Sequence, residues 1–170
     1  MARAIPALAS LLSLSLAMLA CGAQSAADAH VAVRVDTVAM DRETHSPVVI
    51  LEEMDGSRRL PIWIGHAEAS SIDSRLREER AVRPNTHDLA KRLIDGLGGD
   101  LLRVVVSDLE GGIYYARIVL QRSGQIVEID ARPSDAIAIA LRTGAPVFVT
   151  EPLFARARED AEQGERGSRI

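Results

Sequence analysis

The sequence predicts an α+β fold of two layers, in which mostly antiparallel sheets carry helices on one face. Short segments with alternating apolar and polar residues are separated by turn dipeptides, which is typical of strands joined by hairpins. An order of three strands followed by a helix occurs twice, over residues 31–80 and over residues 102–144. This repetition indicates duplicated β-β-β-α units.

The first half begins with period-two alternation at residues 31–38 and continues with an apolar strand at 47–53. The aspartate–glycine dipeptide at 55–56 is a tight-turn signal, so a strand at 59–64 completes a hairpin. Pro61 cannot donate a ladder hydrogen bond, which favours an edge position or a bulge for that strand.

Two helices are expected between the two sets of strands, one over residues 66–80 and one that starts at Thr86. Thr86 is the expected N-cap of the second helix because its hydroxyl can accept a backbone hydrogen bond there. Trp63, just before the first helix, is expected to be a core or interface anchor. One face of the second helix is lined by Leu89, Leu93, Ile94 and Leu97.

The second half has the same plan. Pro133 suits the first turn of a helix, and Ser134 and Asp135 place acceptors at its N-terminus. Residues 136–141 have no polar member, so this helix is expected to be buried on most sides until Gly144 ends it. The strands of this half are expected at 102–106, 113–120 and 125–131, with turns at 108–112 and 123–124 and a short closing strand at 146–149.

The N-terminus reads as a targeting segment. Residues 1–21 have an early positive charge and then an apolar run, which is typical of a signal peptide, and Cys21 stands where bacterial lipoproteins carry the lipidated cysteine. Residues 22–30 form a tether of small residues, residues 31–154 the folded domain, and residues 155–170 a charged tail expected to be a frayed helix or disordered.

Cleavage by an ordinary signal peptidase at residues 27–29 is the alternative, and Cys21 is then discarded. Both alternatives predict an exported protein of the cell envelope or periplasm. With Cys21 lipidated, the protein is anchored to the membrane. It has no internal disulfide because Cys21 is the only cysteine, so the apolar core has to stabilise the fold alone.

Composition limits the function classes. The aromatic fraction is only 3%, which leaves few rings on which the bases of a single strand could stack. The formal net charge is −4, the wrong sign for holding nucleic acid by bulk electrostatics. A nucleic-acid role therefore requires a local basic patch.

Acidic residues lie at the end of the last strand of the second half. Glu128 and Asp130 share one strand face, and Asp135 follows one helical turn later. Converging carboxylates suit Mg²⁺ or Mn²⁺, which prefer oxygen ligands and assist phosphoryl chemistry. The alternative is that Asp130 and Asp135 cap the helix and pair with Arg132. His87, next to Asp88, has either a chemical role or a cap or surface role.

Four segments of the sequence stand out: LPIWIG with the following Glu68 and Ala69 (60–69), RPNTHDL (83–89), DARPSDAIA (130–138) and RTGAP (142–146). These segments resemble the bifunctional nuclease family. Their order and spacing agree with the family over residues 31–154. The resemblance implies an α+β domain with a duplicated, interleaved arrangement that often self-associates, hence a homo-oligomer. Plant members are credited with DNase and RNase activity.

The first hypothesis is therefore a nuclease that hydrolyses phosphodiester bonds in DNA and RNA with a divalent metal, Mg²⁺ or Mn²⁺. Carboxylates, Asp130 and Asp135 first among them, would bind the metal, His87 would act as base or acid, and Arg132 would bind phosphate. The expected catalytic set is Glu68, His87, Asp88, Asp130, Arg132 and Asp135.

The second hypothesis is a non-catalytic exported module that oligomerises and binds a protein or a small ligand. The acidic net charge, the scarce aromatics and the lipobox-like Cys21 support it. In this case Asp130, Arg132 and Asp135 form a structural network around the buried helix.

Overall fold

The computed structural model describes residues 29–79 and 81–157. The predicted signal peptide with Cys21, most of the tether and the tail beyond residue 157 lie outside the described residues. The elements are β1 (His30–Met40), β2 (Pro47–Glu53), β3 (Arg59–Trp63), α1 (His66–Leu76), α2 (Thr86–Gly96), β4 (Gly99–Glu110), β5 (Ile113–Arg122), β6 (Gln125–Ala131), α3 (Pro133–Thr143) and β7 (Val147–Thr150).

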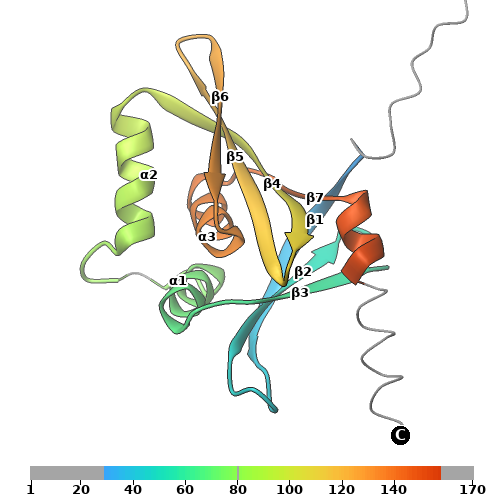
Figure 1. The fold of residues 1–170 in the computed structure, drawn as a ribbon. Helices are drawn as coiled ribbons and strands as arrows, with labels where there is room; N and C mark the ends of the chain where they lie inside the picture. Colours follow the sequence, from blue (N-terminus) through green and yellow to red (C-terminus); the bar gives the residue numbers. More distant parts are fainter. Residues whose placement is uncertain (1–28, 80, 158–170) are drawn as a thin grey trace, which may run out of the picture.

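The strands form one mixed seven-stranded sheet in the order β3-β2-β1-β7-β4-β5-β6 (Figure 1). Every neighbouring pair is antiparallel except β4 and β7, which are parallel. The predicted closing strand is thus not at an edge, because β7 joins the antiparallel set β1–β3 to the set β4–β6. The predicted α+β class with a mostly antiparallel sheet is confirmed.

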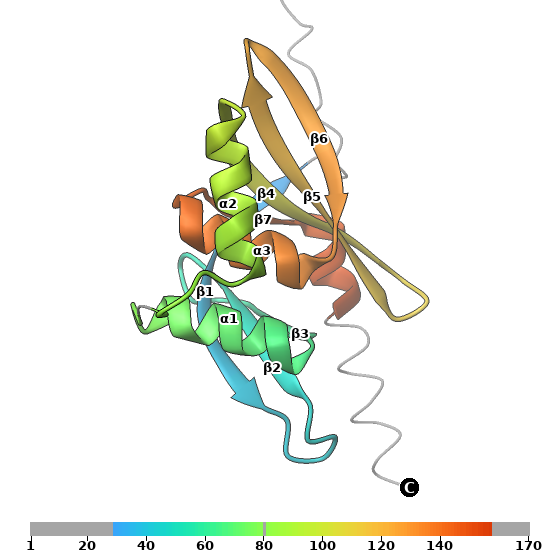
Figure 2. The same cartoon turned by 90° about the vertical axis from the view of Figure 1, so that its left-hand side faces the viewer.

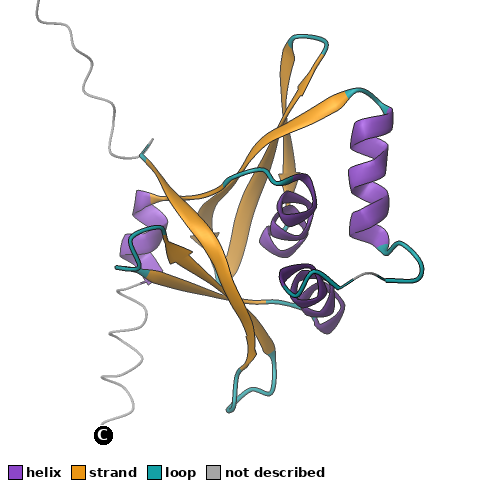
Figure 3. Cartoon of the chain, turned by 180° about the vertical axis from the view of Figure 1, so that it is seen from behind, coloured by secondary structure: helices purple, strands orange, loops and turns teal. Residues whose placement is uncertain are grey.

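The helix layer covers one face of the sheet, where α3 contacts α1, α2, β4 and β5. Figure 2 shows α1, α2 and α3 on the same side, and Figure 3 shows α1 and α3 next to the sheet with α2 farther out. Residues 151–157 form a further helix on the other side of the sheet (Figure 1). Each half of the chain has three antiparallel strands and then a helix, but their equivalence as a duplicated unit stays a prediction.

The core lies between α3 and the sheet. Residues 136–140 are all buried, as the run of apolar residues predicts, and Gly144 ends the helix in the left-handed conformation with φ 76°. Ile137 of α3 and Ile72 of α1 are fully buried beside strand residues such as Val104. Complete burial of one such side chain stabilises the fold by roughly 1.5–3 kcal/mol.

Several predicted boundaries are wrong. The first helix ends at Leu76 rather than near residue 80. Asn85, not Thr86, is the N-cap of α2, because its side chain accepts from the Asp88 N–H while the Asp88 carboxylate accepts from the Asn85 N–H. The expected turn at 108–112 is mostly strand, since β4 pairs with β5 up to Glu110.

Two apolar features predicted from periodicity lie at the surface. Trp63 is 52% exposed and is therefore not a core residue; its indole N–H donates to Asp41 Oδ2 at 2.9 Å. Leu89 and Leu93 of α2 and its C-cap residue Leu97 are exposed, so this face of the helix is not covered by the sheet. None of the helices within residues 29–79 and 81–157 has the length and apolar character needed to cross a membrane.

Candidate functional site

Polar side chains from the starts of all three helices meet on the helix layer. Arg132 donates through Nε to Asp135 Oδ2 at 2.7 Å and through Nη2 to Glu68 Oε1 at 2.6 Å. Asp135 Oδ1 lies 3.1 Å from His87 Nε2. Four further residues are connected to this set, and we call the whole the helix-junction network: Glu68, Ser71, Asn85, His87, Asp88, Arg132, Asp135 and Arg142.

Local sequence explains how α3 contributes two of these groups. Pro133 occupies the first helical position, and Arg132 is the N-cap in extended conformation with φ −66° and ψ 143°. Asp135 lies three residues after Arg132, which brings its carboxylate within reach of the guanidinium. The expectation that Asp135 caps the helix is therefore not met, because α3 has no side-chain cap and Asp135 binds Arg132 and His87.

The other ring nitrogen of His87 contacts Ser71. Ser71 Oγ lies 2.8 Å from His87 Nδ1 and accepts from Asn85 Nδ2 and from Arg142 Nη2, both at 2.9 Å. Because a hydroxyl has two acceptor sites and one hydrogen, the hydrogen of Ser71 points at Nδ1. The hydrogen-bond count thus assigns neutral His87 as the Nε2–H tautomer, which donates to Asp135.

Ser71, His87 and Asp135 have the residue types of a nucleophilic triad, but Ser71 is not placed as a nucleophile. The residue is only 6% exposed, and both acceptor sites of its oxygen are engaged. A nucleophilic serine has to present a lone pair to the substrate while a base removes its proton. Ser71 instead fixes the orientation of His87.

Asp88 is held on the far side of the same network. Arg142 Nε donates to Asp88 Oδ1 at 2.6 Å, and Arg142 Nη1 donates to the Ala138 carbonyl at 2.8 Å. The Arg142 side chain is only 6% exposed. The sequence hypotheses named neither Ser71, Asn85 nor Arg142. Arg142 belongs to a segment of the family resemblance, which could have indicated it, whereas nothing in the local pattern marks Ser71.

The electrostatics of the network favour ionised carboxylates. Hydrogen bonds from its own backbone N–H and from Arg132 lower the pKa of Glu68. Burial raises the pKa of Asp135, but hydrogen bonds from Arg132 and His87 outweigh it, and the net pKa is lowered. At Asp88 burial is likewise outweighed, by Asn85 and Arg142, so its pKa is lowered. The two carboxylates around Arg132 raise its pKa.

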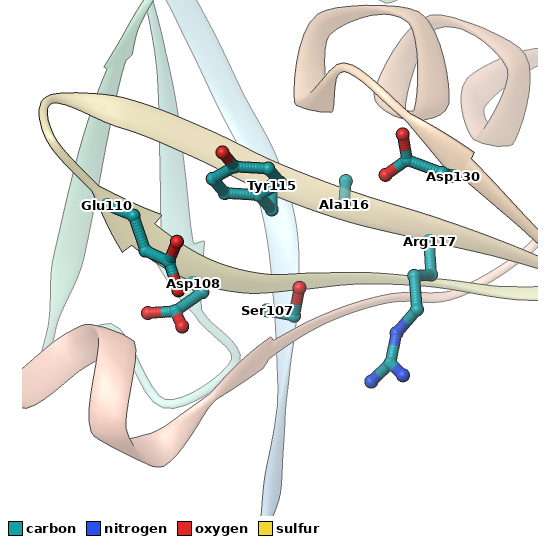
Figure 4. A pocket seen from close by; sticks show the side chains of 7 residues that line it. All are labelled: Ser107, Asp108, Glu110, Tyr115, Ala116, Arg117 and Asp130. Atoms are coloured by element: carbon teal, nitrogen blue, oxygen red, sulfur yellow. The ribbon is translucent and has the colours of Figure 1, made fainter.

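Asp130 lies apart from the network. Ala131 packs against the core, so Asp130 points to the opposite face of β6, where it is the register partner of Arg117 on β5. Figure 4 shows Asp130 with Arg117 and Asp108 at a pocket of about 390 Å³. Five of the six expected catalytic residues are thus brought together, and Asp130 is not.

The described residues do not fit a preformed metal site. Asp135 uses both carboxylate oxygens on Arg132 and His87, and Asp130 lies on the other face of β6. Within residues 29–79 and 81–157, no group of three or more His, Cys, Asp or Glu side chains is arranged to hold a metal ion.

Comparison with known proteins assigns the family. The sequence model described as "Bifunctional nuclease domain" matches residues 49–162. An uncharacterized protein of Mycobacterium tuberculosis is 42% identical over 125 residues, which are 74% of this chain and 74% of that protein. Bifunctional nuclease 1 of Oryza sativa is 28% identical over 116 residues, 66% of this chain and 35% of the rice protein.

Bifunctional nuclease 1 of Arabidopsis thaliana is 29% identical over 111 residues, 63% of this chain and 34% of the plant protein. The matches to the plant proteins therefore span about a third of their length. The family model covers more than half of this chain, from within β2 to beyond β7, and includes all three helices of the helix layer. The chain belongs to the bifunctional nuclease domain family.

Proposed function

We propose that the protein is a nuclease that hydrolyses phosphodiester bonds in DNA and RNA, with the exposed side of the helix-junction network as its active site. One observation carries this proposal: the hydrogen-bonded pair His87–Asp135 lies beside the guanidinium of Arg132, whose side chain is 66% exposed. A histidine oriented by a carboxylate next to an accessible guanidinium suits proton transfer at a bound phosphate.

Each residue has a distinct role in this proposal. Arg132 binds a phosphate oxygen through its guanidinium, whose donors suit phosphate geometry. The proton is transferred by the His87–Asp135 pair: His87 Nε2–H donates to Asp135, whose 31% exposed carboxylate exchanges the proton with the substrate, and Ser71 holds the ring at Nδ1. A divalent metal would add charge neutralisation and an activated water, but the described residues provide no preformed site for it. The Mg²⁺ or Mn²⁺ requirement stays a prediction.

The test is cleavage of labelled single- and double-stranded DNA and of RNA by the purified protein. We expect His87→Gln and Arg132→Ala each to lower the rate at least about a hundredfold, the usual size of a general acid–base contribution. Arg77→Ala is the matched control, because Arg77 is 65% exposed and pairs with Asp73 at 3.0 Å on α1. Absence of cleavage, or equal rates in the variants and the control, refutes the proposal; an EDTA arm tests metal dependence.

A different observation favours a second candidate, an oligomeric binding module. Leu89 and Leu93 of α2 and its C-cap residue Leu97 are 53–62% exposed, and β6 is an edge strand that exposes Val127 and Ile129. The register pairs these two with Leu120 and Ile118, so they lie on the helix-bearing face of the sheet. The Leu97 carbonyl accepts from Arg122 at the end of β5, so the C-terminal end of α2 is hydrogen-bonded to the β5–β6 hairpin.

These five residues form an apolar surface (Leu89, Leu93, Leu97, Val127 and Ile129) suited to a second copy of the chain. An edge strand offers unpaired backbone groups, and a two-fold interface would bury the same surface on both copies. Sedimentation velocity tests this candidate: Leu93→Gln and Ile129→Thr should shift the protein to monomer, while Met54→Gln, at an equally exposed turn residue, should not. A wild-type protein that is monomeric at high concentration contradicts it.

Export and lipid anchoring are part of the proposal as well. Residues 1–21 read as a signal peptide, and Cys21 is the residue that would carry the lipid. We expect the expressed full chain to fractionate with membranes and Cys21→Ser to be released into the soluble envelope fraction. Identical fractionation of both proteins speaks against lipidation.

A further inference from the structure

A second pocket lies where α1, the connection to α2, and α2 itself come together. It encloses about 410 Å³ and lies on the Asn85 side of the helix-junction network. Four cationic side chains line it, against two carboxylates, Glu79 and Asp88. We call it the α1–α2 basic pocket and define it by its cations: Arg75, Lys91, Arg92 and Arg142.

The charge of this pocket is opposite to that of the chain. Its described lining carries four positive and two negative side chains, whereas the whole sequence has a formal net charge of −4. A local basic surface is what the composition requires of an acidic protein that binds nucleic acid. The positive charge of the lining and the concave shape of the pocket thus make it a candidate anion site.

Two of its cations have no carboxylate in direct contact in the described part of the chain, although Arg92 acts on Asp88 at longer range and lowers the pKa of that carboxyl. Lys91 pairs with Asp95 and Arg142 with Asp88, but Arg75 donates through Nε only to the Leu141 carbonyl, at 3.1 Å. Among the described residues, neither Arg75 nor Arg92 has a carboxylate within 4.0 Å. Both are exposed. Their charges are therefore available to a ligand.

Other features of the pocket also bear on how it would bind an anion. The guanidinium of Arg142, 6% exposed, is paired with Asp88, so the net positive charge of the pocket comes from Arg75 and Arg92. Asn85 begins the 11-residue helix α2 at the same place, and the positive end of the helix dipole favours an anion there. Val82 and Pro84 also line the pocket, and Val82 is 99% exposed, so a sugar of the backbone can pack on it.

We propose that the α1–α2 basic pocket binds the phosphodiester backbone of a nucleic-acid strand. The inference rests on the proposed function in that the bound strand is the substrate. Its lining contains no aromatic side chain among the described residues, so bases are not stacked there and the contact is made to the backbone. Asn85 Nδ2 and Arg142 Nη2 both reach Ser71 Oγ, which contacts His87, so this subsite adjoins the proposed catalytic histidine.

The experiment measures binding separately from cleavage. The anisotropy of a fluorescent 20-nucleotide DNA strand, and of the matching RNA, is titrated with purified protein in EDTA at several salt concentrations. The test variant is Arg75→Ala/Arg92→Ala, and the matched control is Arg77→Ala/Arg117→Ala, which removes the same total charge from other parts of the surface. Thermal unfolding verifies that all three proteins are folded.

We expect the test variant to raise Kd at least about tenfold and to reduce the slope of log K against log salt by about 1.4, because each single-strand phosphate contact contributes about 0.7. The control should change Kd less than about twofold. Equal weakening by both variants, unchanged binding in the test variant, or no binding by the wild type overturns the inference. Displacement of the strand by an equal concentration of inorganic phosphate also overturns it, since the pocket then binds a single phosphate group.

Cleavage assays distinguish this inference from the nuclease proposal. If the wild type binds through the pocket but cleaves no substrate, the nuclease proposal fails and the backbone site stands. If the wild type cleaves and the test variant binds as well as the wild type, the backbone site fails and the nuclease proposal stands.

Discussion

Replacement of Arg142 by methionine tests whether the helix-junction network holds the three helices together. Arg142 donates from α3 to Asp88 of α2 at 2.6 Å and to Ser71 Oγ of α1 at 2.9 Å. Methionine keeps much of the volume of the aliphatic stem and removes the charge. The substitution thus isolates the contribution of the guanidinium from that of packing.

The expected loss of stability follows from Asp88, which is left without its ion-pair partner. Removing one member of a buried ion pair destabilises a protein by roughly 3–5 kcal/mol, because the other charge stays buried and unpaired. The Asp88 side chain is 32% exposed, so water compensates part of its charge and the lower end applies. We expect Arg142→Met to lower the free energy of unfolding by about 3 kcal/mol, or Tm by about 10 °C for a domain of this size.

Urea unfolding followed by circular dichroism at 222 nm measures this loss. Arg117→Met is the matched control, because Arg117 pairs with Glu128 at 3.4 Å and both side chains are 49% exposed. The control should lose less than about 1 kcal/mol, as is usual for surface ion pairs. The double variant Arg142→Met/Asp88→Asn should recover part of the loss by removing the stranded charge. A loss below about 1 kcal/mol in Arg142→Met refutes the reasoning.

Three further predictions concern stability. The pKa values of Glu68, Asp88 and Asp135 are lower in the folded protein than their ordinary values of 4.5 and 3.8. These carboxylates therefore stabilise the folded state fully at neutral pH, and the stabilisation is lost as pH falls below about 4.5. Urea midpoints from pH 7 to pH 3 measure the loss, and a flat profile contradicts it. Gly144→Ala should destabilise by about 1 kcal/mol because φ is 76°, whereas Gly96→Ala, in helix α2 with open space around it, should stabilise by roughly 0.5–1 kcal/mol; equal effects in thermal unfolding contradict this. Ser71→Ala should cost about 1–3 kcal/mol in urea unfolding, because His87 Nδ1 loses its hydrogen-bond donor. Neutral His87 should stay the Nε2–H tautomer, since Asp135 still accepts at Nε2, and ¹⁵N shifts of the ring that report Nδ1–H contradict the assignment.

Much of the fold is predictable from local pattern. Alternating residues, turn dipeptides and the apolar run at 136–141 correctly predict the hairpins and the buried helix, because burial of one face imposes a period on the sequence. The position of β7 between β1 and β4 is not predictable in this way. Strand order depends on contacts between residues 31–33, 104–106 and 147–149, which lie far apart in the sequence.

Only part of the candidate site could be predicted, because only some of its contacts join residues that are close in the sequence. Arg132 and Asp135 are three residues apart, so their contact is local, and the helix start at Pro133 fixes it. Ser71 reaches His87 across two helices, and no spacing within the chain indicates that contact. Alternation does predict that Asp130 and Ala131 lie on opposite faces of β6, but not which face carries the helices.

The ion pairs of Arg132 bear on whether this residue can bind a phosphate at all. Its side chain is 66% exposed but that of Glu68 only 16%, so displacing Glu68 would leave a mostly buried carboxylate without its partner. The hydrogen bonds to Asp135 and Glu68 use only Nε and Nη2 of Arg132, which leaves Nη1 for a phosphate oxygen. Asp135 is also held by His87, whose side chain is only 10% exposed, and that contact does not depend on Arg132. A phosphate can therefore bind at Nη1 of the guanidinium while Asp135 keeps His87 in place. Pairing with two carboxylates holds Arg132 in one orientation and is compatible with its proposed role.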